Sequence, residues 1–258
     1  MNSREFSHID QDEDDQAIIK PSKIIKKINA PKICLIPFYH DVIEKLRKKG
    51  VLKEIAKIPS IVVPPIKLYE MNFEERRIGV LSSSLGAPFS AGNLEIAIAL
   101  GCEKFLSVGS CGVLDKKFKR GHLIVVTSSI REEGTSNHYI PASREVIVEK
   151  QITNKIQQSL KKRDIKYIAG KNITTDALFR ETIPQIDKWK QEGAISIDME
   201  ASALLAVAKF RKVQLGYILV AGDDVSGKKW NRRLLSLPFS KPEGFFWLGA
   251  EILTDIYN

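Results

Sequence analysis

The feature that most constrains the fold is the alternation of short apolar runs with amphipathic stretches from Pro31 onward. Apolar runs predict buried strands at residues 32–36, 76–84, 105–108, 123–127, 167–174, 194–197 and 215–222. The stretches between them predict helices at residues 40–49, 88–100, 145–162, 200–210 and 244–257. Strands that alternate with helices along a whole chain predict an α/β fold, with a central β-sheet and helices on its faces.

The domain organisation is predicted to be simple. Residues 1–22 are mostly polar and lack hydrophobic periodicity, which is typical of a flexible leader. Residues 23–258 contain no internal repeat and no Pro/Gly linker that would divide the core. A chain of 258 residues is compatible with one large α/β domain. We therefore expect a leader followed by a single domain.

Composition argues against several classes of protein. No apolar run approaches the roughly 20 residues of a membrane-spanning helix, so we expect no membrane partner. The three cysteines are widely spaced and form no CxxC pair, which argues against a disulfide framework and a metal site and favours a cytoplasmic protein. The net charge of +9 favours anionic partners, but no nucleic-acid-binding motif accompanies it.

Two short loops lie where ligands bind in such sheets, at the ends of predicted strands. SSSLGAP, residues 82–88, offers hydroxyls and backbone N–H groups to an anion or a sugar. VGSCGVL, residues 108–114, places two glycines around Ser110 and Cys111, where they permit close approach to a ligand. The alternative for each is a plain turn, and we interpret Cys111 as a buried thiol rather than a nucleophile.

Two acidic clusters also follow predicted strands. Asp198 and Glu200 flank Met199 between a buried strand and a buried helix, and Asp223 and Asp224 end the next strand. Carboxylates beside such apolar segments are costly unless something polar meets them. Helix capping by Asp198 and turn formation by Asp223 and Asp224 are the structural alternatives.

In order and approximate spacing, SLGAP, GSCGVL, DMEAS and VAGDDVSG resemble the motifs of the nucleoside phosphorylase superfamily, particularly uridine phosphorylase and its relatives. Residues 125–141 and 174–182 resemble the same family, and the resemblance covers about residues 32 to 224. It implies a single-domain fold with a central mixed β-sheet flanked by helices. It also implies a homo-oligomer with sites near subunit interfaces, and no cofactor other than inorganic phosphate as a possible co-substrate.

The resemblance assigns roles to individual residues. Glu200 is expected to bind the ribose hydroxyls, with Met199 packed against the sugar and Ser83 and Ser110 beside it. Asp224 is expected to protonate the leaving base as general acid, with Asp223 as the alternative if the alignment slips by one. The expected base-binding residues are Phe179, Leu178, Arg180 and Asp198.

The arginines that bind phosphate in the family have no counterparts here. Residues 36–42 lack the family's glycine and arginine, the second arginine position is Ser107, and residues 63–69 lack the third. Phe38 or Tyr39 is expected to fill the vacated space. The uracil-reading glutamine and arginine are also absent, since Thr182 and Pro184 fall near their positions. The remaining phosphate candidates are Ser83, Ser110, Arg180 and Arg131, with Arg144 or Lys67 as further possibilities.

The expected activity is cleavage of the N-glycosidic bond of a nucleoside, by phosphorolysis to free base and ribose 1-phosphate. A hydrolytic nucleosidase and a catalytically weak nucleoside-binding protein are the alternatives that the missing arginines leave open. The base is also left open, because Asp224 favours a purine while residues 130–141 favour the uridine enzymes.

Overall fold

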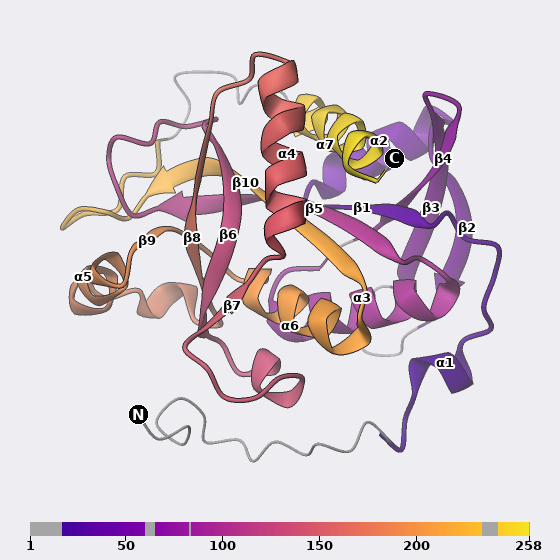
Figure 1. Cartoon of the computed structure of the whole chain (residues 1–258), viewed down its shortest axis with the longest axis horizontal. Helices are drawn as coiled ribbons and strands as arrows, with labels where there is room; N and C mark the ends of the chain where they lie inside the picture. The colour runs from indigo at the N-terminus through magenta and orange to yellow at the C-terminus, as the bar shows by residue number, and fades with distance from the viewer. Residues whose placement is uncertain (1–16, 60–64, 83, 234–241, 258) are drawn as a thin grey trace.

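The chain folds around one mixed β-sheet that carries helices on both faces (Figure 1). The computed structural model describes residues 17–59, 65–82, 84–233 and 242–257. The described strands are β1 (Ile33–Pro37), β2 (Lys53–Ile58), β3 (Ile66–Phe73), β4 (Arg76–Leu81), β5 (Lys104–Val113), β6 (Leu123–Glu132), β7 (Glu145–Ile147), β8 (Tyr167–Thr175), β9 (Ala194–Asp198) and β10 (Gln214–Asp224). The helices are α1 (Pro21–Ile24), α2 (His40–Lys48), α3 (Ala87–Leu100), α4 (Lys150–Lys162), α5 (Ile183–Gln191), α6 (Ala201–Arg211) and α7 (Pro242–Ile256), with 3₁₀ turns η2 (Thr135–His138) and η3 (Leu178–Arg180).

The sheet closes on itself at one end. Its strands follow the order β10-β6-β8-β9-β5-β1-β4-β3-β2, and β10 also pairs with β5. Strands β10, β6, β8, β9 and β5 therefore form a ring, from which β1, β4, β3 and β2 extend. The β1–β4, β1–β5, β5–β10, β6–β8 and β8–β9 pairs are parallel, while β5–β9, β6–β10 and the outer pairs are antiparallel. The predicted α/β class with a mixed sheet is confirmed.

The apolar core lies on both faces of this sheet. Helices α2, α4 and α7 cover one face, and α3 and α6 cover the other (Figure 1). Helix α6 is buried from Ala201 to Ala208, as expected of a helix that is apolar on nearly every face. Strand β10 is buried from Leu215 to Ala221, which fits a strand that is covered on both sides.

Two predicted elements were wrong in type or extent. Residues 145–147 form β7 on the edge of β6, so the predicted helix begins only at Lys150. Residues 108–114 are not a turn, because β5 continues to Val113. The glycines serve close packing instead: a Cβ on Gly112 would lie 2.9 Å from Ile197 Cγ2, and one on Gly109 would lie 3.2 Å from the Phe38 ring.

Several elements were not predicted at all. Strand β2 is largely exposed at the sheet edge, β3 lies between β2 and β4 with residues of mixed burial, and helix α5 is short. Residues 1–16 of the expected leader lie outside the described residues, while α1 crosses its expected boundary at residue 22. None of the described helices is long and apolar enough to span a bilayer.

Candidate active site

Two adjoining cavities lie where β5, β9 and β10 approach the loop before α3. The Phe38 cavity, of about 290 Å³, is lined by Phe38, His40, Leu85, Gly109, Ser110, Glu200, Tyr217 and Leu219. The Asp223 cavity, of about 230 Å³, is lined by Leu85, Ser110, Cys111, Gly112, Leu178, Glu181, Ile197, Asp198, Met199, Glu200, Gly222 and Asp223. Because Leu85, Ser110 and Glu200 line both, the two cavities form one elongated site with Glu200 at its centre.

Glu200 is held at the N-cap of α6 with its carboxyl group at the junction of the cavities. Its Oε1 accepts a hydrogen bond from the Gly86 N–H at 2.6 Å, and its Oε2 accepts one from the Met199 N–H at 3.3 Å. Gly86 has a φ of 94°, a conformation that favours glycine, so the loop before α3 can present its N–H to this acid. Burial, followed by the charge of Asp198, raises the pKa of Glu200 to about 8.

The carboxylate of Asp198 is fully engaged by the protein. Its Oδ1 accepts hydrogen bonds from Asn172 Nδ2 and Thr174 Oγ1, each at 2.7 Å. Its Oδ2 accepts from the Ala201 N–H at 2.9 Å and the Tyr217 hydroxyl at 3.1 Å. Asp198 was expected to bind the base. It borders the Asp223 cavity, but these bonds place it as the anchor of β8, β9 and the start of α6.

The neighbouring acids Asp223 and Asp224 face different surroundings. The pairing of β10 with β5 has an irregularity between Ala221 and Asp224, where β10 carries one extra residue. Such bulges redirect side chains, and here Asp223 lines the cavity. Asp224 instead forms an ion pair with Arg233, in which Arg233 Nη2 lies 2.9 Å from Asp224 Oδ2. Its Oδ1 accepts a hydrogen bond from the Ser226 N–H at 2.9 Å. The acid expected first as proton donor therefore lies outside both cavities, and its alternative lies inside.

Glu181 is a site residue that the sequence analysis missed. It lines the Asp223 cavity between η3 and α5, where a capping box between Thr182 and Gln185 fixes the chain. Burial and the charge of Asp223 raise its pKa to about 7. In the sequence, Glu181 is marked only by its position just before the Thr-Ile-Pro start of a helix. That pattern predicts a helix boundary rather than a residue that binds a ligand.

The other expected base-binding residues divide between the cavity and the solvent. Leu178 lines the Asp223 cavity, whereas the side chain of Phe179 is 94% exposed. Arg180 is exposed and lines neither cavity. Of these two apolar residues, only Leu178, the one expected if the register slipped, lines a described cavity.

Two of the residues expected beside the sugar line the cavities. Met199 lines the Asp223 cavity, and Ser110 lines both cavities. Ser83 lies outside the described residues. Cys111 is buried and its burial raises the pKa of the thiol, which suits the predicted inert thiol rather than a nucleophile.

Arg131, Arg144 and Lys67, three of the basic residues considered for phosphate, form contacts outside the two cavities. The Arg131 guanidinium donates hydrogen bonds to Ser136, Asn137, Ser143 and the carbonyls of Ile140, Pro141 and Ser143. Arg144 pairs with Glu132 and Glu192, and Lys67 pairs with Glu54. No lysine or arginine occurs among the described residues that line the two cavities, where His40 is the one basic side chain.

The positions that would carry the family's phosphate loop are filled with apolar groups. Phe38 lines the larger of the two cavities and packs over Gly109. Tyr39 is buried and stacks with Phe245 at 6.4 Å between ring centroids. Ser107 is fully buried opposite Tyr217 in β10. Within the described ranges, no group of three His, Cys, Asp or Glu side chains could hold a metal ion.

Comparison with known proteins agrees with this geometry. A family model described as the phosphorylase superfamily matches residues 32–234. Guanosine phosphorylase of Halorubrum lacusprofundi is 26% identical over 164 residues, covering 63% of this chain and 68% of that protein. Uridine phosphorylase of Treponema pallidum is 24% identical over 157 residues, covering 57% of this chain and 61% of that protein.

Solved structures share the fold at lower sequence identity. Purine nucleoside phosphorylase from Toxoplasma gondii, in complex with immucillin-H, aligns with a TM-score of 0.71 and 17% identity over 88% of this chain and 90% of its own. AMP nucleosidase from Bacteroides thetaiotaomicron aligns with a TM-score of 0.68 and 17% identity over 87% and 88%. Since the family model covers most of its length, this chain belongs to the phosphorylase superfamily.

Proposed function

We propose that this chain cleaves the N-glycosidic bond of a nucleoside by phosphorolysis, giving the free base and ribose 1-phosphate. Membership of the superfamily supports the reaction class, and relatives named guanosine and uridine phosphorylase support nucleosides as substrates. The observation that carries the proposal is the shared cavity of Glu200 and Asp223, two acids from different elements. The reaction requires no cofactor, because phosphate is a substrate.

The two acids divide the chemistry between sugar and base. Glu200 accepts hydrogen bonds from the ribose hydroxyls and stabilises the positive charge that develops on the sugar. As the C1′–N bond breaks, its electron pair moves to the base, and Asp223 donates a proton to the base. A phosphate oxygen then bonds to C1′. Met199 packs against the sugar and Leu178 against the base, with Ser110 between the two ends of the site.

Hydrolysis is the second candidate, favoured by one specific observation. The described cavity walls contain no lysine or arginine, and the aromatic ring of Phe38 lines the end where phosphate would bind. The experiment that decides is incubation of a nucleoside panel with and without phosphate. Phosphate-dependent release of base with ribose 1-phosphate supports phosphorolysis. Phosphate-independent release with free ribose supports hydrolysis, and no release from any nucleoside refutes both.

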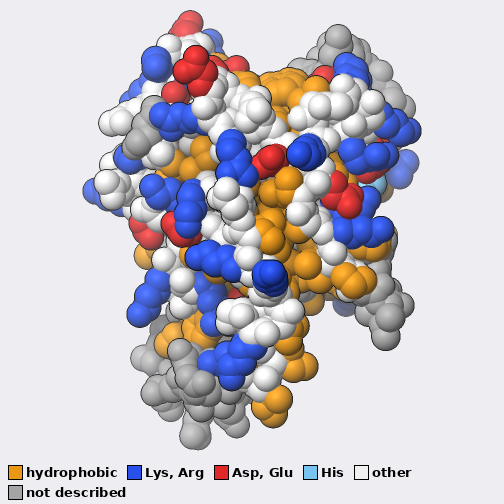
Figure 2. Space-filling view, turned by 90° about the vertical axis from the view of Figure 1, so that its right-hand side faces the viewer, with side chains coloured by type: hydrophobic (Ala, Val, Ile, Leu, Met, Phe, Trp, Pro, Cys, Tyr) orange, Lys and Arg blue, Asp and Glu red, His pale blue; other side chains and the backbone are white. Residues whose placement is uncertain are grey.

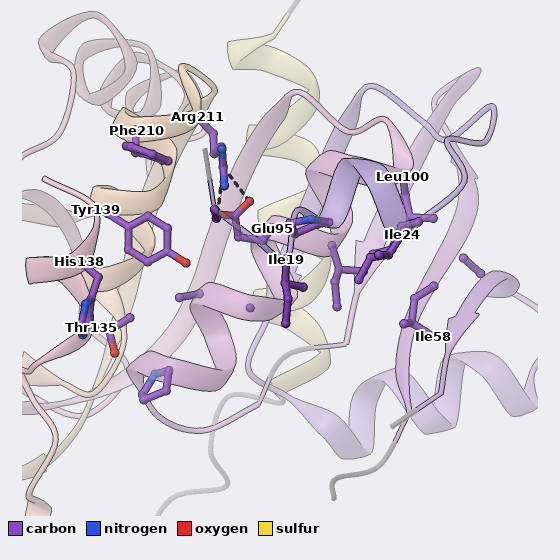
Figure 3. A pocket seen from close by; sticks show the side chains of 18 of the residues that line it. Ile19, Ile24, Ile58, Glu95, Leu100, Thr135, His138, Tyr139, Phe210 and Arg211 are labelled. Atoms are coloured by element: carbon purple, nitrogen blue, oxygen red, sulfur yellow. Dashed lines mark hydrogen bonds and ion pairs between the residues drawn. The ribbon is translucent and has the colours of Figure 1, made fainter. Parts of the chain in front are cut away.

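We further propose that the chain assembles with copies of itself. A groove of about 1490 Å³ runs between the N-terminal segment, β2, α3, η2 and α6, with Tyr139 and Phe210 on one wall and Ile24 and Ile58 on the other (Figure 3). Ile18, Ile19 and Ile24 are largely exposed. Figure 2 shows hydrophobic side chains exposed between lysines and arginines on one face. Light scattering after size exclusion tests this, and a monomer at micromolar concentration would reject it.

We also propose a cytoplasmic location. Cys34, Cys102 and Cys111 are free and buried, which is typical of proteins from reducing compartments. Fractionation of cells that express the full chain, with a tag at its C-terminus, tests the location. Recovery of the chain in a membrane or secreted fraction would reject it.

A further inference from the structure

The base end of the site contains two carboxyl groups, of which the proposed reaction uses only one. Glu181 and Asp223 both line the Asp223 cavity, one from the segment between η3 and α5 and the other from the bulge of β10. Among the described residues, no side chain or backbone N–H donates a hydrogen bond to the Glu181 carboxyl. An acid that no protein donor satisfies, in a cavity proposed to hold a base, is available to the reaction.

Asp223 is constrained on one side. The Trp230 indole N–H donates to Asp223 Oδ2 at 2.6 Å. An indole is a donor only, so this oxygen must accept, and a proton on Asp223 must sit on Oδ1. With Oδ2 held in this way, Oδ1 is the atom of Asp223 that is available to exchange a proton with a neighbouring acid.

We propose that Glu181 is a second acid of the base end, which shares one proton with Asp223 and supplies it to Asp223 for the leaving base. This inference rests on the proposed function. In the reaction the pair begins with one proton, which passes to the base as the C1′–N electron pair moves there. The pair ends as two carboxylates and takes up a proton from water after the base leaves, so protons and charge balance.

The surroundings favour one shared proton over two or none. The titratable groups that line the cavity are Cys111 from β5, Asp198 from β9, Glu200 at the start of α6, and the pair itself. All of these are neutral or negative, and no described lysine or arginine lines the cavity to stabilise a second carboxylate. Partial burial, followed by the charge of Asp223, raises the pKa of Glu181 to about 7, so the pair retains its proton near neutral pH.

The inference also selects a substrate class. The negative charge of a leaving purine is neutralised by a proton on the imidazole ring, which a carboxyl group can supply. Uracil spreads its charge over two carbonyl oxygens, which suit amide or guanidinium donors. None of the described lining residues of the Asp223 cavity carries such a side chain. A carboxyl pair therefore fits a purine nucleoside.

The test compares the pH dependence of kcat on a purine nucleoside and on its 7-methyl derivative, whose imidazole ring already carries a positive charge. For the unmodified substrate, the wild-type rate should fall as pH rises through about 7, because the pair loses its proton. Glu181→Gln should move this midpoint down by about one pH unit and reduce the rate at pH 8 about tenfold. Glu181→Asp should return the midpoint of the fall in kcat to about the wild-type pH. Every variant should cleave the 7-methyl substrate at a rate within about twofold of wild type.

Asp187→Asn is the matched control, since Asp187 is an exposed acid of α5 that lines neither cavity. It should leave the midpoint unchanged. An unchanged midpoint in folded Glu181→Gln, or equal losses on both substrates, would overturn the role of Glu181 alone. Full activity of Asp223→Asn would instead remove the proposed acid. If the wild type releases no base from any nucleoside, the proposed function and this inference both fail.

Discussion

The two acidic clusters of this site use the same residue types in opposite order. In Asp198-Met199-Glu200, the Asp198 carboxylate accepts four hydrogen bonds within the protein, and Glu200 lies where the two cavities meet. In Asp223-Asp224, Asp223 lines the cavity, while Asp224 forms an ion pair with Arg233 and accepts a hydrogen bond from the Ser226 N–H. Each cluster thus places one acid in a cavity and holds the other in bonds within the protein, and backbone geometry decides which is which.

The largest effect is expected in the first cluster. Glu200→Gln should fold normally and lower kcat/KM about a hundredfold or more, because an amide cannot supply the negative charge that the ionised Glu200 carboxyl offers to the sugar in the transition state. Asp198→Asn should instead lower the melting temperature, because it weakens buried hydrogen bonds to Asn172 and Thr174. Near-normal turnover by folded Glu200→Gln would contradict the proposed contact between Glu200 and the sugar.

In the second cluster, the first acid should affect catalysis and the second should affect stability. Asp223→Asn should reduce kcat on a natural nucleoside by about tenfold to a hundredfold with little change in melting temperature. Asp224→Asn should keep kcat within about threefold but lose roughly 1–2 kcal/mol of stability, because it breaks a mostly buried ion pair with Arg233. A larger loss of kcat in Asp224→Asn would restore the first expectation from the sequence.

A smaller contrast is expected between Leu178 and Phe179. Leu178→Ala should raise KM about fivefold, since it removes an apolar contact of roughly 1 kcal/mol from the cavity wall. Phe179→Ala should leave KM within about twofold, because the side chain is solvent-exposed. Steady-state kinetics on one substrate measures both, and the reverse order would mean that η3 rearranges on binding.

The smallest expected effect is on the stability of the ligand-free protein. Glu200 has a pKa of about 8 in the folded chain against an ordinary value of 4.5. Its stabilising contribution is therefore complete below about pH 4.5 and is lost as pH rises through about 8. Between pH 6 and pH 9, the melting temperature of the wild type should fall by roughly 5 °C more than that of Glu200→Gln. Parallel curves for the two proteins would show that Glu200 titrates normally.

Much of the fold followed from periodicity, and the failures have physical causes. Buried strands such as β6 and β10 were predicted because both faces are covered and the apolar run is continuous. Strands β2 and β3 were not, because neither is a continuous apolar run and β2 lies at the sheet edge. The Gly-Ser-Cys-Gly segment was interpreted as a turn because its glycines suggested a bend, whereas they permit close packing of β5 against Phe38 and Ile197.

The candidate site was predictable as a set of motifs but not as a set of side-chain directions. Glu200 and Ser110, which were expected to bind ribose, both line the Phe38 cavity, and their role in binding stays a prediction. The choice between Asp223 and Asp224 depends on a single bulge in β10, which no periodicity reveals. Glu181 stands in a segment between two short helices, and only the tertiary fold brings it to Asp223.

A crystal structure with a non-cleavable purine nucleoside analogue and sulfate tests the account most directly. The account predicts ribose hydroxyls within hydrogen-bond distance of the Glu200 carboxyl, the imidazole ring of the base beside Asp223, and Asp224 still paired with Arg233. Sulfate in the Phe38 cavity, beside His40 and Ser110, would favour phosphorolysis, and water there would favour hydrolysis. A nucleoside bound away from Glu200, or a base that contacts Asp224 instead of Asp223, would contradict the account.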